Sequence, residues 1–432
     1  MKLRNLRIGP CLKTSVLGGE EGEVALIADV ESEKFNIDTI WFSVPRKYET
    51  WLTKDRYDGF LVALLYPAMA YGENIEIDGT VSERLYQNVK ECVIPILLVY
   101  SPNLKKINIS VKETTDKIIE TATHIGTGFS GGVDSFCTIY DKFVLETNPK
   151  YKIDILTNIN VGNYYGYRSM ETDVLFQRAF DRLSGFPSYV GLPYIPVNSK
   201  LAYIYGEKWS FMQVHLLYTI AGILSMQNCF TKYYFASALS FAEIPYYAKN
   251  YVNYGIAGFC DVYILQFLST ESLSIIPNGQ QYTRAEKTER ISHYSPTYDF
   301  LEVSPRDSTG KQDVFRPKCI RTLTSLDSLD KLELYSKIFD LERYRKNRFY
   351  IRCQQVLDYK KDPYVTDNID FARLHGKKFP SYCIAFIVCL PKNVLKVLSR
   401  ILGKKLTAKI RTMLKMKDKF DYFSMISQEN QR

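Results

Sequence analysis

The amino-acid sequence predicts an α/β protein built around a parallel β-sheet with helices on both faces, preceded by an α+β module and followed by a helical region. From residue 123 onward, apolar segments with strand-like content alternate with longer segments of helical periodicity, as in strand–helix–strand units. Before that point strands and helices occur in mixed order, and after residue 318 the periodicity is helical. We therefore expect three parts, at residues 1–120, 121–317 and 318–432.

In the first part, β-branched and aromatic residues indicate several short strands. These strands are expected at residues 23–30, 39–45, 73–79 and 105–112. Two further segments have helical spacing. The first ends at Gly72, and the second begins with Ser82, whose hydroxyl is suited to cap the helix.

In the central part, strands and helices alternate. Strands are expected at residues 151–161, 193–199 and 232–240. Helices are expected at residues 134–146, 168–185 and 209–226, the second of them ended by Gly185. Strands connected in this way are parallel, and ligands of such sheets bind at the carboxyl ends of the strands. The loop at residues 126–135 lies at such an end, directly before a helix.

The last part is dominated by residues 325–359, which have helical periodicity. The apolar run from Tyr382 to Leu390 is shorter than the roughly 20 residues that cross a bilayer. It therefore predicts a buried helix and no membrane span. Residues 1–23 lack the uninterrupted apolar core of a signal peptide.

Cysteine usage points to a reducing compartment. The chain has nine cysteines, an odd number, and several lie in apolar patterns: Cys92, Cys229, Cys383 and Cys389. We expect these to be small buried hydrophobic residues and not a disulfide framework. A cytoplasmic location follows.

The positive charge is concentrated near the end of the sequence. The chain has a net charge of +9, and residues 392–419 carry the same excess, with ten basic residues against Asp418. A segment of this kind binds nucleic acid, anionic lipid or an acidic partner, or it forms the solvated face of a terminal helix. The solvated face is the interpretation that we expect.

The stretch "THIGTGFSGGVDSF", residues 123–136, fits three catalytic patterns. The glycines at 126, 128 and 131 match the dinucleotide fingerprint G-x-G-x-x-G. Gly128, Ser130 and Gly132 match the hydrolase motif G-x-S-x-G. Residues 130–135 spell S-G-G-x-D-S, a pyrophosphate-binding loop.

The first two patterns lack the partners that they need. A dinucleotide site requires an acid at the end of the next strand, but Asp154 lies near the start of that strand. A hydrolase requires a later histidine, for which His215, His293 and His375 are candidates. No oxyanion segment precedes the motif, however, and the hydrolase pattern gives Asp134 no role.

Every position of the pyrophosphate loop has a chemical role. Gly131 and Gly132 let the backbone approach phosphate oxygens, and the N–H groups of the next helical turn form an anion site. Ser130 and Ser135 add hydroxyl donors. Asp134 beside phosphate is explained by Mg²⁺, which prefers oxygen ligands. The chain contains no G-x-x-x-x-G-K-[ST] loop for cleavage of a γ-phosphate.

These residues resemble the PP-loop, or N-type, ATP pyrophosphatase superfamily. They are most similar to 7-cyano-7-deazaguanine synthases of the queuosine pathway and their divergent long forms, some of which occur in bacterial anti-phage defence operons. The resemblance covers about residues 126–329 and is carried by "FSGGVDS", the strand and helix order, "TRAEKTERI" and "KCIRTL". It implies an adenine nucleotide alpha hydrolase-like fold.

Members of this family activate a carboxylate with ATP, which yields an acyl-adenylate and pyrophosphate, and a nitrogen nucleophile then displaces AMP. The resemblance therefore implies a ligase that uses ATP and Mg²⁺ to form an amide, a nitrile or a conjugate with an amine. It implies a small carboxylate substrate such as a 7-deazapurine. For the defence-associated forms it implies a partner protein from the same operon, which the enzyme modifies.

The resemblance also assigns residues to roles. Asp134, Ser130 and Ser135 would act in catalysis, with Asp134 on Mg²⁺. The nucleotide would be held by Ser130, Gly131, Gly132, Val133, Asp134, Ser135, Asn158, Val161, Arg284 and Lys287. His215 and Asp261 would contact the substrate. From residue type alone, His215 also fits a core histidine, and Arg284 with Lys287 also fits a charged helix face.

Two features depart from the family pattern. Of the synthase's zinc-binding cysteines only Cys319 has a counterpart, because Asp313 and Arg316 stand at two of the other positions, so no zinc is expected. Residues 258–272 replace the synthase's substrate motif, which leaves the substrate open. A non-catalytic ATP-binding scaffold, or a tRNA-modifying enzyme that contacts RNA through residues 392–419, are therefore the alternatives.

Overall fold

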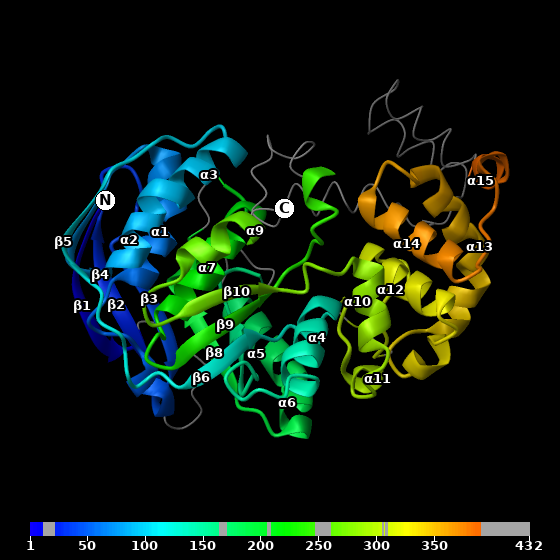
Figure 1. Cartoon of the computed structure of the whole chain (residues 1–432), viewed down its shortest axis with the longest axis horizontal. Helices are drawn as coiled ribbons and strands as arrows, with labels where there is room; N and C mark the ends of the chain where they lie inside the picture. Colours follow the sequence, from blue (N-terminus) through cyan, green and yellow to red (C-terminus); the bar gives the residue numbers. More distant parts are fainter. Residues whose placement is uncertain are drawn as a thin grey trace. The chain divides into compact units, whose positions relative to one another are not determined.

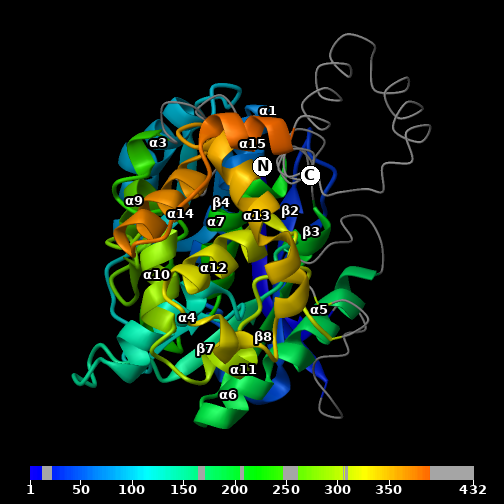
Figure 2. The same cartoon turned by 90° about the vertical axis from the view of Figure 1, so that its right-hand side faces the viewer.

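The computed structural model describes residues 1–11, 22–163, 171–204, 209–246, 261–304, 306 and 310–389. The chain divides into two compact units, Met1–Gln281 and Tyr282–Arg432. Figures 1 and 2 show the elements of each unit. The basic segment at residues 392–419 lies outside the described residues.

One sheet runs through the whole first unit. Its ten strands, among the described residues, have the order β10-β9-β6-β7-β8-β3-β2-β1-β4-β5. They are β1 (Lys2–Pro10), β2 (Glu23–Glu31), β3 (Thr39–Pro45), β4 (Ile75–Ser82), β5 (Ile109–Thr115), β6 (His124–Gly128), β7 (Ile155–Ile159), β8 (Tyr194–Ser199), β9 (Phe230–Ala236) and β10 (Ser274–Asn278). The predicted strand at residues 39–45 has the same bounds as β3.

The sheet has a parallel half and a mixed half. Strands β10, β9, β6, β7 and β8 are all parallel to their neighbours. Strand β3 then pairs with β8 in the antiparallel sense, and β2 and β1 continue antiparallel before the parallel strands β4 and β5. The prediction of an α/β protein with a largely parallel sheet is therefore confirmed.

The seam between the two halves is short. Phe42 of β3 pairs with Ser199 of β8, and Ser43 pairs with Asn198. Because main-chain hydrogen bonds cross this seam, residues 1–120 and the parallel strands share one sheet and one compact unit. The expected boundary at residue 120 therefore separates two halves of a sheet, and the second unit begins at Tyr282, before the expected residue 318.

Helices flank this sheet. They are α1 (Asp58–Tyr71), α2 (Glu83–Asn88), α3 (Ile94–Tyr100), α4 (Val133–Ile139), α5 (Glu171–Leu183), α6 (Gly185–Val190), α7 (Phe211–Leu224) and α9 (Asp261–Ile264). Helix α1 ends, as predicted, where Gly72 adopts a left-handed conformation, φ 65°. Ser82 caps α2 by accepting a hydrogen bond from Leu85 N. Gly185, expected to end α5, instead begins α6 after a one-residue break.

Helices α1 and α7 approach each other closely because Gly59 has no side chain. A Cβ atom at Gly59 would lie 2.7 Å from the carbonyl oxygen of Ala221 in α7. Gly222 of α7 makes a second close contact, because a Cβ atom there would lie 2.9 Å from Ile159 Cγ2 in β7. Helix α7 is thus held between α1 and the parallel strands by two glycine contacts.

Asp58, the first residue of α1, is fully buried and ties together distant parts of the unit. Its carboxylate accepts hydrogen bonds from Ser82 N and from Gln227 Nε2, each at 2.8 Å. Gln227 in turn accepts a hydrogen bond from Thr270 Oγ1 at 2.7 Å. Burial raises the pKa of Asp58 to about 6, although these hydrogen bonds and the charge of Arg56 act in the opposite direction.

The second unit is mostly helical over its described residues. Its helices are α10 (Arg284–Ile291), α11 (Thr297–Phe300), α12 (Pro317–Ser328), α13 (Leu341–Asp358), α14 (Pro363–Leu374) and α15 (Tyr382–Val388). Asp327 of α12 is 8% exposed and pairs with Arg352 at 2.8 Å and Arg348 at 3.2 Å, both from α13. This pair of arginines attaches α13 to α12.

The prediction of a buried helix from Tyr382 onward is wrong. A helix forms, but Tyr382 is 56% exposed and Ile387 67% exposed. Ala385 packs with Cys353 and Cys389, and Cys383 is exposed, contrary to expectation, while Cys92 is half-buried. In the part of the chain that the structure describes, no helix combines the length and apolar content needed to cross a bilayer.

The contact at Gly59 predicts a measurable difference between two glycine substitutions. Gly59→Ala should lower the free energy of unfolding by about 1–3 kcal/mol, because α1 and α7 must separate. The control is Gly9→Ala in β1, where the new Cβ atom would meet only Ile27 Cδ1 at 3.4 Å. Chemical denaturation compares the two variants, and equal effects of both substitutions would contradict the role of Gly59.

Asp58 predicts a pH-dependent stability difference. A carboxyl whose pKa is raised by folding contributes stability below its unfolded pKa, and that contribution is lost as pH rises to about 6. The free energy of unfolding of wild type minus that of Asp58→Asn should therefore fall between pH 4 and pH 6, by about 2 kcal/mol. Denaturant titrations at several pH values measure it, and a difference that does not change with pH would contradict the assignment.

Candidate functional site

The pyrophosphate-type loop lies at the point where the order of the parallel strands reverses. The chain runs outward from the central strand β6 through β7 to β8, then returns to the other side of β6 as β9 and β10. Right-handed connections then put the helices of the two directions on opposite faces, and Figure 1 shows α4 and α7 on opposite sides of the strands. Ligands of open α/β sheets bind at the carboxyl ends of strands at this reversal.

Two glycines of the stretch are explained by packing. A Cβ atom at Gly126 would lie 2.5 Å from Phe230 Cε1 and 3.0 Å from Tyr233 Cδ2, both in the neighbouring strand β9. At Gly128 it would lie 3.3 Å from the Tyr233 hydroxyl. These glycines, which the dinucleotide and hydrolase patterns require, make room for aromatic rings.

The remaining glycines shape the loop itself. Gly131 has φ 70°, in the left-handed region that residues with a side chain rarely adopt. Gly132 is extended and precedes the first residue of α4, Val133. Ser135 Oγ donates to the carbonyl of Gly132 at 3.0 Å and lies 3.4 Å from the Oγ of Ser130, which is exposed.

The loop ends in a helix N-terminus at the carboxyl end of β6. Helix α4 continues without interruption into a π-helical turn, Tyr140–Val144. The first N–H groups of a helix have no acceptor within the helix, and the helix dipole adds partial positive charge there. The arrangement of residues 130–135 is therefore suited to bind an anion.

Asp134 lies in the first turn of α4 and is half-buried, with Oδ1 shielded from solvent. A carboxylate in this position is stabilised by the helix dipole. It is also an oxygen ligand of the kind that Mg²⁺ binds, next to the loop that suits an anion. Among the described residues, no group of three or more metal-binding side chains is found.

A hydrogen-bond relay fixes the start of the loop to the neighbouring strands. Asn158 Nδ2 donates to the Tyr194 hydroxyl at 2.7 Å, and that hydroxyl donates to the carbonyl of Phe129 at 2.9 Å. Phe129 N donates to the carbonyl of Thr157 at 2.8 Å. Asn158, assigned from the resemblance to the nucleotide, is buried and contributes here to the position of the loop.

Three other candidate residues lie elsewhere in the first unit. Val161 is buried just beyond β7, and its N–H donates to Asn163 Oδ1 at 3.3 Å. His215 lies in α7, with Nδ1 3.3 Å from the carbonyl oxygen of Met212. Burial lowers the pKa of His215 and favours the neutral imidazole. Asp261 is buried at the start of α9, next to residues 247–260, which lie outside the described residues.

Arg284 and Lys287 belong to the second unit, on α10. Thr283 and Glu286 form a capping box at the start of this helix. Lys287 is fully buried, so its side chain does not lie on a solvent-exposed face of α10. Arg284 is half-buried.

Over the residues that it describes, the structure lacks features that the dinucleotide and hydrolase patterns of residues 123–136 require. Asp154 precedes β7 and pairs with His124 Nδ1 at 2.9 Å, at the opposite end of the strand from a ribose site, as the sequence predicts. Ser130 is not among the described residues with a side chain and a positive φ, which are Asn5, Asp330 and Lys360. The strained turn of a hydrolase nucleophile is therefore missing at Ser130.

The single counterpart of the zinc cysteines is part of the core. Cys319 is fully buried in α12, with Sγ 3.0 Å from Ser304 Oγ. Asp313, at the position of another cysteine, accepts a hydrogen bond from Phe315 N at 3.1 Å. Burial raises the pKa of the Cys319 thiol to about 12, which favours the protonated form over the thiolate that binds zinc.

Sequence reasoning missed Tyr194 and Thr157. Tyr194 is one of 33 tyrosines and carries no motif. Thr157 lies in a buried strand, and its Oγ1 is 2.6 Å from the Tyr233 hydroxyl, beside Gly128. A polar residue inside an apolar strand, next to a predicted loop, was the available signal.

Comparison with known proteins adds no family assignment: no family model, no curated protein and no solved structure matches the chain. The loop and its surroundings are therefore the features of this chain that indicate a function.

The relay predicts that Tyr194 restrains the loop. Tyr194→Phe removes the hydroxyl between Asn158 and Phe129 and should cost about 1 kcal/mol of local stability. Amide hydrogen exchange of residues 129–135 should become roughly fivefold faster. Tyr151→Phe, at a tyrosine that is 44% exposed, is the control. Unchanged exchange in Tyr194→Phe would show that other contacts hold the loop.

Proposed function

We propose that the chain is an ATP-dependent adenylating enzyme that activates a carboxylate, releases pyrophosphate and passes the acyl group to a nitrogen nucleophile. The observation that supports this proposal most is the loop at residues 130–135. It combines a glycine with positive φ, two serines and a carboxylate at a helix N-terminus, at the reversal point of a parallel sheet.

The loop supplies what a departing pyrophosphate needs. Backbone N–H groups of Gly131, Gly132 and Val133 would bind its oxygens without reorganisation, because the loop is already held by β6, α4 and the relay to Tyr194. The hydroxyls of Ser130 and Ser135 add two further donors. These groups bind charge that increases as the bond to the α-phosphate breaks.

Asp134 is the residue that we assign to Mg²⁺. The ion would neutralise part of the charge on the phosphates. The chemistry of the donor set fits, because a first-turn carboxylate adjoins an anion-binding backbone. Asn158, within β7, and Val161, just beyond it, would border the adenine. His215 and Asp261 would contact the substrate.

For the substrate we propose a small carboxylate of the 7-deazapurine class, which gives an amide, a nitrile or a conjugate with an amine of a partner protein in anti-phage defence. This part of the proposal is supported by the resemblance of residues 126–329 alone. A cytoplasmic location belongs to the same proposal.

The chemistry is tested with ATP labelled in the α- and γ-phosphates. We expect AMP and pyrophosphate as products, and ADP with phosphate would contradict the proposal. Asp134→Ala should reduce formation of AMP at least a hundredfold, since a metal ligand is lost. If Asp134→Ala leaves function in cells intact while ATP still binds, the protein is an ATP-binding scaffold and no ligase.

A matched pair of glycines tests the loop by binding. Gly131→Ala and Gly191→Ala both place a side chain at a positive φ, 70° and 71°, which costs roughly 1–2 kcal/mol of stability in each case. Only Gly131→Ala should weaken binding of a non-hydrolysable ATP analogue, by tenfold or more in calorimetry. Equal affinities of the two variants would exclude the loop as the phosphate site.

A further inference from the structure

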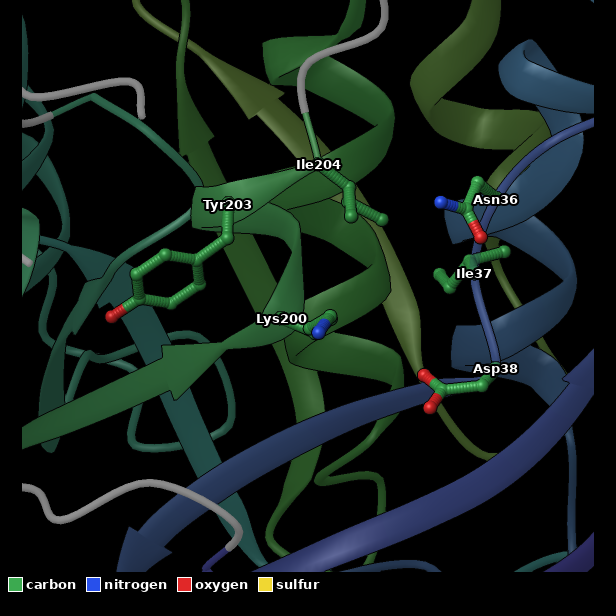
Figure 3. A pocket seen from close by; sticks show the side chains of 6 residues that line it. All are labelled: Asn36, Ile37, Asp38, Lys200, Tyr203 and Ile204. Carbon is green, nitrogen blue, oxygen red and sulfur yellow. The ribbon is translucent and has the colours of Figure 1, made fainter. Parts of the chain in front are cut away.

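A cavity of 450 Å³ lies in the first unit, away from the loop at residues 130–135. Its walls come from two segments, residues 36–38 between β2 and β3, and residues 200–204 directly after β8. Figure 3 shows these two segments on opposite sides of the cavity. The volume falls within the range of roughly 300–1,000 Å³ typical of small-molecule sites.

The cavity carries one charge of each sign. The side chain of Lys200, in a 3₁₀ turn after β8, forms no ion pair or hydrogen bond with any described residue. Asp38 on the facing segment accepts one side-chain hydrogen bond within the described part of the chain, from Thr39 Oγ1 at 3.2 Å. In Figure 3 the carboxylate of Asp38 points towards the side where Lys200 lies, yet no ion pair joins them.

The segment that carries Asp38 is held in place by the packing of Phe35 and by a main-chain hydrogen bond. Phe35 is buried, and its ring lies 5.6 Å from those of Tyr71 and Trp209. The carbonyl of Asp38 accepts a hydrogen bond from Val30 N at 2.8 Å. The backbone beneath the carboxylate is therefore already ordered.

The segment that carries Lys200 is fixed through Tyr203. The Tyr203 hydroxyl donates to Asp173 of α5, and its ring lies 6.5 Å from that of Trp41 in β3. Asn198 at the end of β8 donates to the same Asp173 carboxylate at 3.1 Å and accepts from Asn160 Nδ2 at 2.9 Å. This polar network, with Asn160 and Asn198 buried, holds the turn against both halves of the sheet, so the cavity is preformed.

The cavity lies beyond the carboxyl end of β8, where β3 meets the parallel half of the sheet. Strand β7 separates β8 from β6, which puts the two strand ends roughly 10 Å apart across the sheet. It is therefore a second site at the edge of the sheet where ligands bind, distinct from the pyrophosphate-type loop.

We propose that this cavity binds a small zwitterion, a molecule with an ammonium group and a carboxylate a few bonds apart, such as an α-amino acid. Lys200 pairs with the ligand carboxylate and Asp38 with its ammonium group. The Asn36 amide adds hydrogen bonds, and Ile37 and Ile204 contact the apolar part of the ligand.

The charges argue against other ligand classes. A phosphate or a dicarboxylate would meet the Asp38 carboxylate, and a diamine would meet the Lys200 ammonium group. Each of these pairings places like charges within one cavity, which opposes binding. Only a ligand with both charges satisfies the two walls at once.

The test uses leucine and two of its derivatives with the full chain, in calorimetry at millimolar ligand concentration. Leucine carries both charges, N-acetylleucine only the negative one and leucinamide only the positive one. We expect leucine to bind, and each derivative to bind at least tenfold more weakly, since each leaves one wall charge unpaired. Failure of leucine and of a glycine, alanine, serine and glutamine panel to bind would overturn the proposal.

Substitutions of the two charged residues test whether leucine binds in this cavity. Lys200→Met and Asp38→Asn should each weaken binding of leucine at least tenfold, with melting temperatures close to that of wild type. Lys54→Met, at an exposed lysine outside the cavity, is the control and should bind leucine as wild type does.

Reversal of the two charges provides a second test if a single variant does not fold. The double variant with Lys200→Asp and Asp38→Lys keeps both charges and should retain leucine binding in the opposite orientation, while Lys200→Asp alone should abolish it. Leucine binding that is indifferent to these changes would overturn the proposal. ATP chemistry is not involved, so the outcome is independent of the function proposed for residues 130–135.

Discussion

The first unit depends on a buried carboxylate that joins its two halves. Asp58 begins α1 in the N-terminal half, and Gln227, which donates to it, follows α7 in the parallel half. A carboxylate without donors would cost several kcal/mol in the interior, so both donors have to be held in place. Thr270 holds the Gln227 side chain in place by donating a hydrogen bond to its Oε1 atom. The same helices touch at Gly59, so polar and steric constraints fix one arrangement of α1 on α7.

Local structure could be predicted because its causes lie within a few residues. Gly72 ends α1 and Ser82 begins α2 by backbone conformation and a side-chain hydrogen bond, and both act on their own neighbours. The pairing of Phe42 with Ser199 leaves no such pattern, because main-chain hydrogen bonds do not specify side chains. The helix at Tyr382 shows the same limit, since apolar content does not reveal what packs against it.

The candidate site divides in a similar way. Residues 130–135 could be singled out because a loop that presents its backbone to an anion needs glycine at fixed positions, and the structure gives Gly131 a positive φ. The sequence does not reveal the Tyr194 relay or the cavity between Asp38 and Lys200. Each is assembled from segments that meet only when β7, β8 and β3 lie side by side. Gly126 and Gly128 suggested the dinucleotide and hydrolase patterns, but the space that they leave is filled by aromatic side chains of β9.

The short seam between β3 and β8 also sets an order of events during synthesis. Strand β3 leaves the ribosome long before β8, and until β8 arrives its outer main-chain groups have no strand to pair with. An unpaired edge with buried residues such as Trp41 and Phe42 is a surface on which nascent chains associate. The pairing of β3 with β8 must wait for residue 199, so the outer edge of β3 stays unpaired until that part of the chain has been made.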